Sequence, residues 1–220
     1  MSTQDATTES GFLFYSYHDT TTAALTDAEK GVLDLDVGAN DNDSATIITG
    51  DNVTGLLVPV DGGYRKWWFE ARFAVGTITD GAQAIFIGLT EEGQAANTKP
   101  MADDGTHAVN DIDHVGFHID GADGDGLNFV WNLSGQTAQS TADVATISAV
   151  DTYYNVGMKY EPGDNKVHVY VNGVENVDAA FLLSHASAPL DNLAVCMSCK
   201  ADGGTPVNLL VDWVRIAGEY

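Results

Sequence analysis

Hydrophobic and polar residues alternate along most of this chain. In residues 65–75 (RKWWFEARFAV), every odd-numbered position from 67 onward is apolar, whereas the opposite face carries Trp68, Glu70 and Arg72. A period of two is that of a β-strand with one face in a core and the other turned outward. The segment therefore predicts a strand that forms one wall of a sandwich.

The same alternation recurs in about a dozen short runs separated by Gly-, Asp- and Asn-rich turn clusters. Antiparallel strands of this number and length predict an all-β fold, a two-sheet antiparallel sandwich. The clearest runs are residues 84–89, 114–119, 127–133, 153–160, 166–171, 193–198 and 208–216, and the weaker ones are 12–17, 31–37, 45–49 and 54–59.

Helical periodicity is nearly absent. A single turn is predicted at residues 26–30, where a Thr can cap it, and a second at residues 179–185. Residues 1–10 are polar and without pattern, which predicts a flexible N-terminal arm. Residues 11–220 show no linker and no internal repeat, so they are expected to form a single β-sandwich domain.

The chain of 220 residues carries 32 acidic and 9 basic side chains, a net charge of −23. Such an anionic surface repels nucleic acid and acidic membranes, so neither is expected as a partner. It fits a salt-tolerant protein or an ordinary acidic cytosolic one. The first ten residues lack the features of a secretory signal, and no apolar stretch is long enough to cross a bilayer, which predicts a protein made in a cytoplasm.

Both cysteines lie in one C-x-x-C sequence, Cys196 and Cys199. A zinc site would need two further ligands at matching spacing, and a redox pair would need a helix N-terminus. The surrounding LAVCMSCKA reads as a strand, in which residues three apart point to opposite faces. We therefore expect two buried free thiols.

Three segments together resemble the laminarinase-type enzymes of glycoside hydrolase family sixteen. They are YRKWWFEARFAV with the following AIFIGL, then TYYNVGMKYEPGDNKVHVYVNG, and finally LLVDWVRIAGEY. They occur in the family's order and span residues 64–220. The resemblance implies a concanavalin A-like jelly roll, although fold alone does not fix chemistry.

The catalytic motif of that family, E-x-D-x-x-E, is absent from the corresponding DHVGFHID at residues 113–120. Retaining glycosidases need two carboxylates about 5–5.5 Å apart, whereas the face that carries His114 and His118 offers Asp120 alone. The sequence therefore predicts no catalytic residues and no enzyme. Trp68, Glu70 and Arg72 remain candidates for ligand binding, or else residues of a wall strand.

The Gly-rich stretch at residues 120–126 is the best candidate for a metal site. Asp120, Asp123 and Asp125 alternate with small residues, as the oxygen ligands of calcium loops do. A tight acidic turn between strands is the alternative, because the bidentate Glu of an EF-hand does not follow. Calcium is thus a candidate, and no other cofactor is expected. His114 and His118 are about 13 Å apart on a strand, too far to share an ion.

Four further segments are similar to sequences of tailed-phage virion proteins with the same fold. They are DNDSATIIT, WFEARF, FIGLTEEG and DHVGFHID, within residues 41–120. The resemblance implies a non-enzymatic capsid decoration protein that binds the major capsid protein and other copies of itself, located on the virion and assembled in the host cytoplasm. The alternative is a carbohydrate-binding, lectin-like adhesion module of a tail fibre or cell surface.

Overall fold

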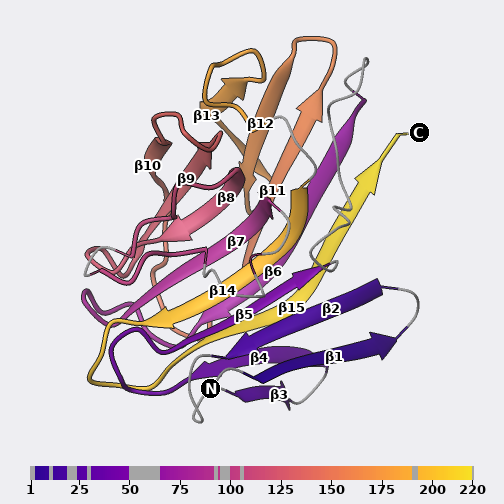
Figure 1. Cartoon of the computed structure of the whole chain (residues 1–220). Helices are drawn as coiled ribbons and strands as arrows, with labels where there is room; N and C mark the ends of the chain where they lie inside the picture. The colour runs from indigo at the N-terminus through magenta and orange to yellow at the C-terminus, as the bar shows by residue number, and fades with distance from the viewer. Residues whose placement is uncertain are drawn as a thin grey trace.

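The structure is a computed structural model that describes residues 3–9, 12–18, 24–28, 31–49, 65–91, 94, 100–104, 107–189 and 193–219, with the backbone path alone up to residue 28. Every regular element in these ranges is a β-strand. Figure 1 shows the strands arranged as two sheets that pack face to face. The predicted all-β jelly-roll sandwich is confirmed.

The strands are numbered in chain order, and each pairs antiparallel with the strands beside it in its sheet. Their bounds are β1 Thr3–Glu9, β2 Phe12–His18, β3 Ala24–Ala28, β4 Val32–Val37, β5 Ser44–Thr49, β6 Trp67–Val75, β7 Gln83–Glu91, β8 His114–Ile119, β9 Gly126–Asn132, β10 Gln139–Thr146, β11 Tyr154–Glu161, β12 Lys166–Val171, β13 Val174–Leu182, β14 Leu193–Ala201 and β15 Val207–Gly218.

Two sheets are formed from these strands. The first, called sheet A, has the order β1-β2-β5-β14-β7-β8-β9-β10, and the second, sheet B, has the order β13-β12-β11-β6-β15-β4-β3. Neighbours in each sheet are often distant in sequence, as in a jelly roll. The C-terminal strand β15 consequently lies beside β6, in the middle of sheet B.

The main core fills the space between the sheets. On β6, Trp67, Phe69 and Phe73 point into it, and both Phe side chains are 0% exposed. From sheet A, Phe117 and Phe129 meet edge to face with ring centroids 5.3 Å apart. Burying one such ring stabilises the fold by roughly 1.5–3 kcal/mol. The inward face of β6 predicted from the sequence is confirmed.

The outer face of sheet A is covered as well. A second apolar cluster forms there, in which Phe86 and Cys196 of the sheet pack with Met101 of the segment that precedes β8. This cover explains why all residues of β8, β9 and β14 are buried rather than only alternate ones. Over β6 of sheet B the described residues form no such cover, and there Trp68 is half-buried and Glu70 is exposed.

A β-bulge interrupts the pairing of β15 with β6. Val211 is paired with Phe73, but the next register partner of β6 is Trp213 opposite Arg72, so that Asp212 is the extra residue. A bulge changes which residues of a strand point to each face. Trp213 and Arg215 therefore lie on the outer face of sheet B, although simple alternation from Val211 would turn them inward.

Several predictions about local structure are wrong. The described part of residues 26–30 belongs to strand β3, and residues 179–182 belong to β13, so neither place is helical. In both, pairing with a neighbouring strand overrides a weak helical propensity. Strands β10 and β13 were missed, because their residues are largely exposed and lack apolar alternation. The strand predicted at residues 54–59 lies outside the described residues.

The N-terminal segment also differs from the expectation. Residues 1–10 were predicted to be a flexible arm, whereas Thr3–Glu9 form strand β1 at the edge of sheet A, paired with β2. An edge strand is held by backbone hydrogen bonds on one side, which a polar sequence can form equally well. In the part of the chain that the structure describes, no helix is long and apolar enough to span a membrane.

Candidate functional site

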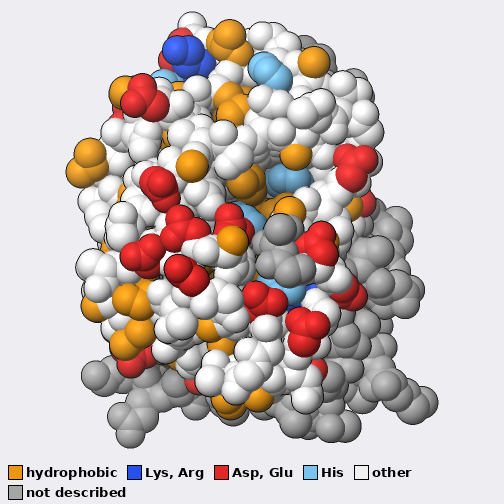
Figure 2. All heavy atoms as spheres, turned by 90° about the vertical axis from the view of Figure 1, so that its left-hand side faces the viewer, with side chains coloured by type: hydrophobic (Ala, Val, Ile, Leu, Met, Phe, Trp, Pro, Cys, Tyr) orange, Lys and Arg blue, Asp and Glu red, His pale blue; other side chains and the backbone are white. Residues whose placement is uncertain are grey.

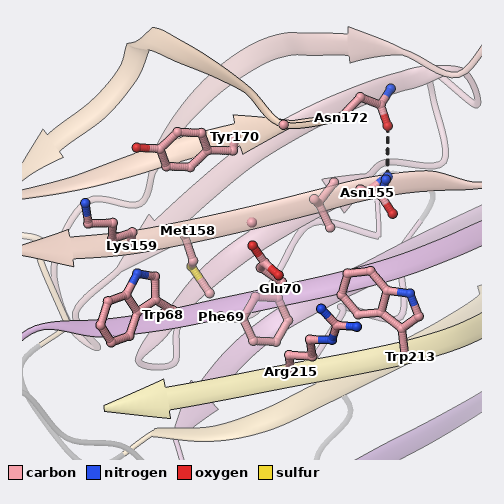
Figure 3. Close-up of a pocket in the computed structure, with 13 residues that line it drawn as sticks. Trp68, Phe69, Glu70, Asn155, Met158, Lys159, Tyr170, Asn172, Trp213 and Arg215 are labelled. Atoms are coloured by element: carbon pink, nitrogen blue, oxygen red, sulfur yellow. Dashed lines mark hydrogen bonds between the residues drawn. The ribbon is translucent and has the colours of Figure 1, made fainter. Parts of the chain in front are cut away.

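A groove of about 520 Å³ lies on the outer face of sheet B. Figure 3 shows side chains of four neighbouring strands, β6, β11, β12 and β15, converging on it. Concave sites of this size are typical places for a small ligand. Its lining consists of Trp68, Phe69, Glu70, Asn155, Val156, Gly157, Met158, Lys159, Tyr170, Asn172, Gly173, Trp213 and Arg215.

Strand register places a charged pair and a gap at the centre of the groove. Glu70 is the partner of Arg215 on one side and of Gly157 on the other, and Gly157 in turn is the partner of Tyr170. Because Gly157 has no side chain, the surface is hollow between Glu70 and Tyr170. A Cβ atom built there would lie 3.3 Å from Glu70 Cγ, so even one methyl group would narrow the groove.

Two tryptophans bound the groove along the strands. Trp68 of β6 is the register partner of Ala217, and Trp213 of β15 is the register partner of Arg72. Arg72 lies four residues after Trp68 on β6. At about 3.3 Å per residue, the rings are separated by roughly 13 Å along the sheet. Figure 3 shows them on opposite sides of Glu70. The groove is thus long enough for an extended ligand rather than a single small ion.

Cationic side chains hold both indole rings. Arg215 Cζ lies 4.5 Å from the centre of the Trp213 ring, and Lys66 Nζ lies 5.6 Å from that of Trp68. Cation–π contacts of this kind are worth about 0.5–1 kcal/mol at exposed sites. They restrict the motion of the rings, so a ligand that stacks on them finds them already positioned.

The groove is bordered by polar groups with fixed partners. Asn155 N–H donates to Asn172 Oδ1 at 2.9 Å, which ties β11 to the turn after β12 (Figure 3). Lys159 Nζ lies 2.7 Å from Glu161, which also receives Lys66 at 3.0 Å. The hydrogen bond to Glu161 raises the pKa of Lys159, and the bonds from Lys159 and Lys66 lower the pKa of Glu161. Lys159 and Glu161 therefore stay charged at neutral pH.

The structure separates the three binding candidates of the sequence. Trp68 and Glu70 line the groove, but Arg72 does not. Its guanidinium is ion-paired with Asp212 and stacks over Tyr153, 4.2 Å from the ring centre. Sequence reasoning did not place Tyr170, Gly157, Trp213 or Arg215 on this face. The matching alternation of the two predicted strands around residues 157 and 170 could have pointed to the first two, whereas the bulge concealed the others.

A smaller hollow of about 220 Å³ lies on the outer face of sheet A, beside His114, His118 and Asp120. Burial lowers the pKa of each His to about 4, so both rings are neutral at pH 7. His114 Nδ1–H donates to Ile112 O at 2.9 Å, and His118 Nε2–H donates to His107 O at 3.0 Å. These rings are hydrogen-bonding groups of a buried layer. Figure 2 shows a face on which His side chains lie among hydrophobic and acidic ones.

The acidic turn at residues 120–126 is stabilised by its own backbone. Asp120 Oδ1 accepts hydrogen bonds from Ala122 N and Asp123 N, both at 2.9 Å. A hydrogen bond with Asp123 raises the pKa of Asp125, and repulsion from Asp123 and Asp80 adds to the effect. Among the described residues, Asp120, Asp123 and Asp125 do not bring three ligand atoms within 4.8 Å of one another.

The C-x-x-C cysteines point to opposite faces of β14, as expected. Cys196 belongs to the cluster on the outer face of sheet A, and Cys199 to the core between the sheets. Both are free thiols. Burial raises the pKa of Cys196 to about 12, and that of Cys199 is raised further by the same cause. Neither sulfur is a thiolate at neutral pH, so neither is available as a ligand or nucleophile.

No protein-family model matches the sequence, and no curated protein matches it. Solved structures match the fold over almost the whole chain. One is a Bacteroides ovatus enzyme of glycoside hydrolase family sixteen, solved with a mixed-linkage glucan product. It shares 15% identity at a TM-score of 0.60, with 90% of this chain and 86% of that one covered.

Two further structures belong to different enzyme classes. A Bacillus licheniformis β-glucanase is 13% identical at a TM-score of 0.57, with 98% of this chain and 97% of that one covered. The alginate lyase A1-II' of polysaccharide lyase family seven is 11% identical at a TM-score of 0.55, with 91% and 84% covered. At such identities the likeness shows the fold, which is the concanavalin A-like jelly roll that the sequence resembled.

These neighbours correct the prediction that the chain is not an enzyme. They are glycoside hydrolases and a polysaccharide lyase, so the architecture is one that carries enzymes. The prediction rested on one missing pair of carboxylates. That absence argues against retaining glycoside hydrolysis, but a lyase breaks its substrate by different chemistry, so the inference from one motif to all catalysis was wrong.

The capsid decoration role finds no support among these structures. The segments that carried the phage resemblance lie largely in β5, β6, β7 and β8, which are interior strands of the two sheets. Their alternation serves core packing, which a jelly roll of any function needs. Those segments therefore indicated the fold and not the partner.

Proposed function

We propose that this chain binds an oligosaccharide in the groove on the outer face of sheet B. The observation that carries the proposal is the pair of tryptophans, Trp68 and Trp213, on either side of a hollow that contains Glu70 and Arg215. The carbohydrate-active enzymes that share the fold support this class of ligand.

A sugar ring has an apolar face of C–H groups and a periphery of hydroxyls. Half-exposed indole rings can stack on the former, because an aromatic face offers a large apolar surface at little conformational cost. The carboxylate of Glu70 can accept hydrogen bonds from hydroxyls, the guanidinium of Arg215 can donate them, and the Asn155 and Asn172 amides can do both. The groove offers both kinds of contact over the length of a short oligosaccharide.

The proposal is tested by affinity electrophoresis and calorimetry with soluble mixed-linkage β-glucan, laminarin and alginate. We expect saturable binding to at least one of them. Trp68→Ala and Trp213→Ala should each weaken binding about tenfold, which is about 1.4 kcal/mol. Trp68→Phe, which keeps an aromatic face, should keep most of the affinity.

Val177→Ala serves as the matched control, because Val177 is 71% exposed and is not among the groove residues. Its affinity should equal that of the unaltered protein. Reducing ends and unsaturated products are measured in the same samples, so that cleavage of a bound polymer is detected. The proposal fails if none of the three polysaccharides binds, or if the double variant Trp68→Ala/Trp213→Ala binds as well as the unaltered chain.

A further inference from the structure

Three segments that are remote in sequence meet at one end of sheet A. The turn between β4 and β5 is joined to the end of β14 and the turn after it by three backbone hydrogen bonds: Asn42 N to Ala201 O at 2.9 Å, Ala201 N to Asp43 O at 2.9 Å and Gly204 N to Ala39 O at 2.8 Å. The third is the segment that covers the outer face of sheet A, which contributes His107. The side chains of Asp41, His107 and Asp202 converge there, with one ligand atom of each within 4.8 Å of the others.

His107 is held rigidly at this junction. Its side chain is 0% exposed, and its backbone adopts a φ of 47°, in the left-handed region that non-glycine residues seldom occupy. Its N–H donates to Asp104 Oδ1 at 2.9 Å, and its carbonyl accepts the Nε2–H of His118 at 3.0 Å. Surrounding bonds thus fix both the backbone and the direction of the imidazole.

The hydrogen bonding of this ring directs Nε2 at Asp202. Nδ1 lies 3.1 Å from the carbonyl oxygen of Ala102, which can only accept, so Nδ1 must donate. In the neutral imidazole Nε2 is then a bare acceptor. Nε2 is buried without a hydrogen-bond partner, yet it lies 3.1 Å from Asp202 Oδ1. The lone pair of a neutral ring would be repelled by a carboxylate at that distance, so a proton or a metal ion must lie between Nε2 and Asp202.

We propose that Asp41, His107 and Asp202 bind a divalent transition-metal ion, with Zn²⁺ as the best fit. Zn²⁺ takes imidazole nitrogen and carboxylate oxygen at about 2.0–2.2 Å, so two of its ligands lie about 3–4 Å apart. The Nε2–Oδ1 separation of 3.1 Å matches one edge of such a site. The third ligand, Asp41, is exposed, so its side chain can turn inward to complete the site.

The donor set selects among metals. A neutral imidazole favours Zn²⁺ and its neighbours over Ca²⁺ and Mg²⁺, which prefer oxygen alone. The bond from Nδ1–H to the Ala102 carbonyl is the usual outer contact of a metal-bound His, which fixes the tautomer and directs Nε2 at the ion. Three protein ligands leave room for water. The ion would join the three segments and anchor the cover of sheet A.

The test uses the full chain, stripped with chelator and titrated with ZnCl₂ by calorimetry. We expect one saturable site and a higher thermal midpoint with Zn²⁺. Asp202→Asn should weaken Zn²⁺ binding at least tenfold, and Asp41→Asn should weaken it less. CaCl₂ at the same ionic strength should not reproduce the effect. Because His107→Gln alters a buried residue and can unfold the chain, the two surface-side variants decide the matter.

Asp123→Asn is the matched control, because it removes one carboxylate from the acidic turn and leaves the proposed ligands intact. It should bind Zn²⁺ as the unaltered chain does. Co²⁺ supplies a direct signature, since a visible absorption band that differs from that of aqueous Co²⁺ should appear on binding and be lost in Asp202→Asn. Equal Zn²⁺ affinity in the unaltered chain and Asp202→Asn would overturn the proposal. The proposal would also be overturned if NMR showed that the His107 imidazole carries protons on both nitrogens and that its signals do not change when Zn²⁺ is added.

Discussion

Glu70 on β6 and Arg215 on β15 are register partners at the centre of the sheet B groove. Both lie on the outer face, and the guanidinium of Arg215 also covers the ring of Trp213 at 4.5 Å. One residue of β15 therefore connects the charged centre of the groove with its aromatic end. This arrangement exists because the extra residue Asp212 shifts the register of β15 against β6 by one residue. The shift turns Trp213 and Arg215 to the outer face.

Replacing Gly157 by Ala should weaken oligosaccharide binding with little effect on folding. The new Cβ would lie 3.3 Å from Glu70 Cγ, which can move, and 3.3 Å from the Phe69 carbonyl oxygen, which needs a shift of only a few tenths of an ångström, and it would fill the hollow at the groove centre. We expect an affinity loss of several-fold and a thermal midpoint within a degree or two of the original. Unchanged affinity in this variant would place the ligand elsewhere on the surface.

Gly116→Ala provides the contrast. A Cβ at Gly116 would lie 2.7 Å from Ile87 O and 2.8 Å from Gly88 Cα, which are backbone atoms that cannot yield. The Phe86 ring lies close to the same spot, with Cζ at 2.9 Å. Overpacking of this kind typically costs 1–3 kcal/mol. We expect a lower urea midpoint for Gly116→Ala than for Gly157→Ala, and equal midpoints would contradict the close approach of β7 and β8.

The architecture could be predicted because it follows from local patterns. The alternation of residues 65–75 and of 114–119 reflects strand geometry directly, and both strands appear where expected. The groove could be predicted only in part. The outward positions of Trp68 and Glu70 could be predicted, because they follow from the same alternation. The outward position of Trp213 depends on a bulge that no local pattern shows.

The proposed metal site lay beyond sequence reasoning for a different cause. Its ligands come from three turns or segments separated by 66 and 95 residues, the differences between positions 41, 107 and 202. Spacing rules detect ligands that lie near one another in the chain, which is why the acidic turn at Asp120 drew attention instead. The pairing of β14 with β5 and β7, and of β7 with β8, brings the three segments together.

The thiols of Cys196 and Cys199 should not react in the native protein. Both are buried, and burial raises the pKa of Cys196 to about 12, so the reactive thiolate is negligible at pH 8. We expect no colour with Ellman's reagent in the native state, and two thiols per chain after addition of guanidinium chloride. Rapid reaction of one thiol under native conditions would mean that the cover of sheet A opens readily.

Acidification should destabilise the chain through His114 before most carboxylates titrate. Burial lowers its pKa from 6.5 to about 4, with smaller influences from His118, which lowers it, and Asp111, which raises it. The unfolded chain therefore binds a proton between pH 6.5 and 4 that the folded chain excludes, so stability falls as the pH falls through that window. The full shift corresponds to roughly 3 kcal/mol.

The measurement is urea denaturation in chelator at pH 7 and pH 5, with His114→Gln for comparison. Glutamine can still donate to the Ile112 carbonyl but does not titrate, so the variant should lose less stability on acidification than the unaltered chain. Identical losses in the two proteins would assign the acid sensitivity to other groups.

Lys200 fastens the segment that covers sheet A. It is 0% exposed, and its Nζ contacts the carbonyl oxygens of Met101 at 3.4 Å and Ala102 at 2.6 Å and forms an ion pair with Asp103. In Lys200→Met the stem keeps most of its packing, but both carbonyls lose the ammonium donor, and Ala102 keeps its contact with His107. We expect a lower thermal midpoint, with faster amide exchange concentrated in residues 100–112.

The control for this variant is Lys166→Met, which removes a partly exposed cation on sheet B and should leave exchange in that segment unchanged. Opening of the cover should also expose Cys196, which packs against Met101 in the outer cluster, so its reaction with Ellman's reagent should accelerate in Lys200→Met. Because Cys199 points into the core between the sheets, its reactivity should stay low. If exchange rises uniformly across both sheets instead, Lys200 supports the whole sandwich and not the cover alone.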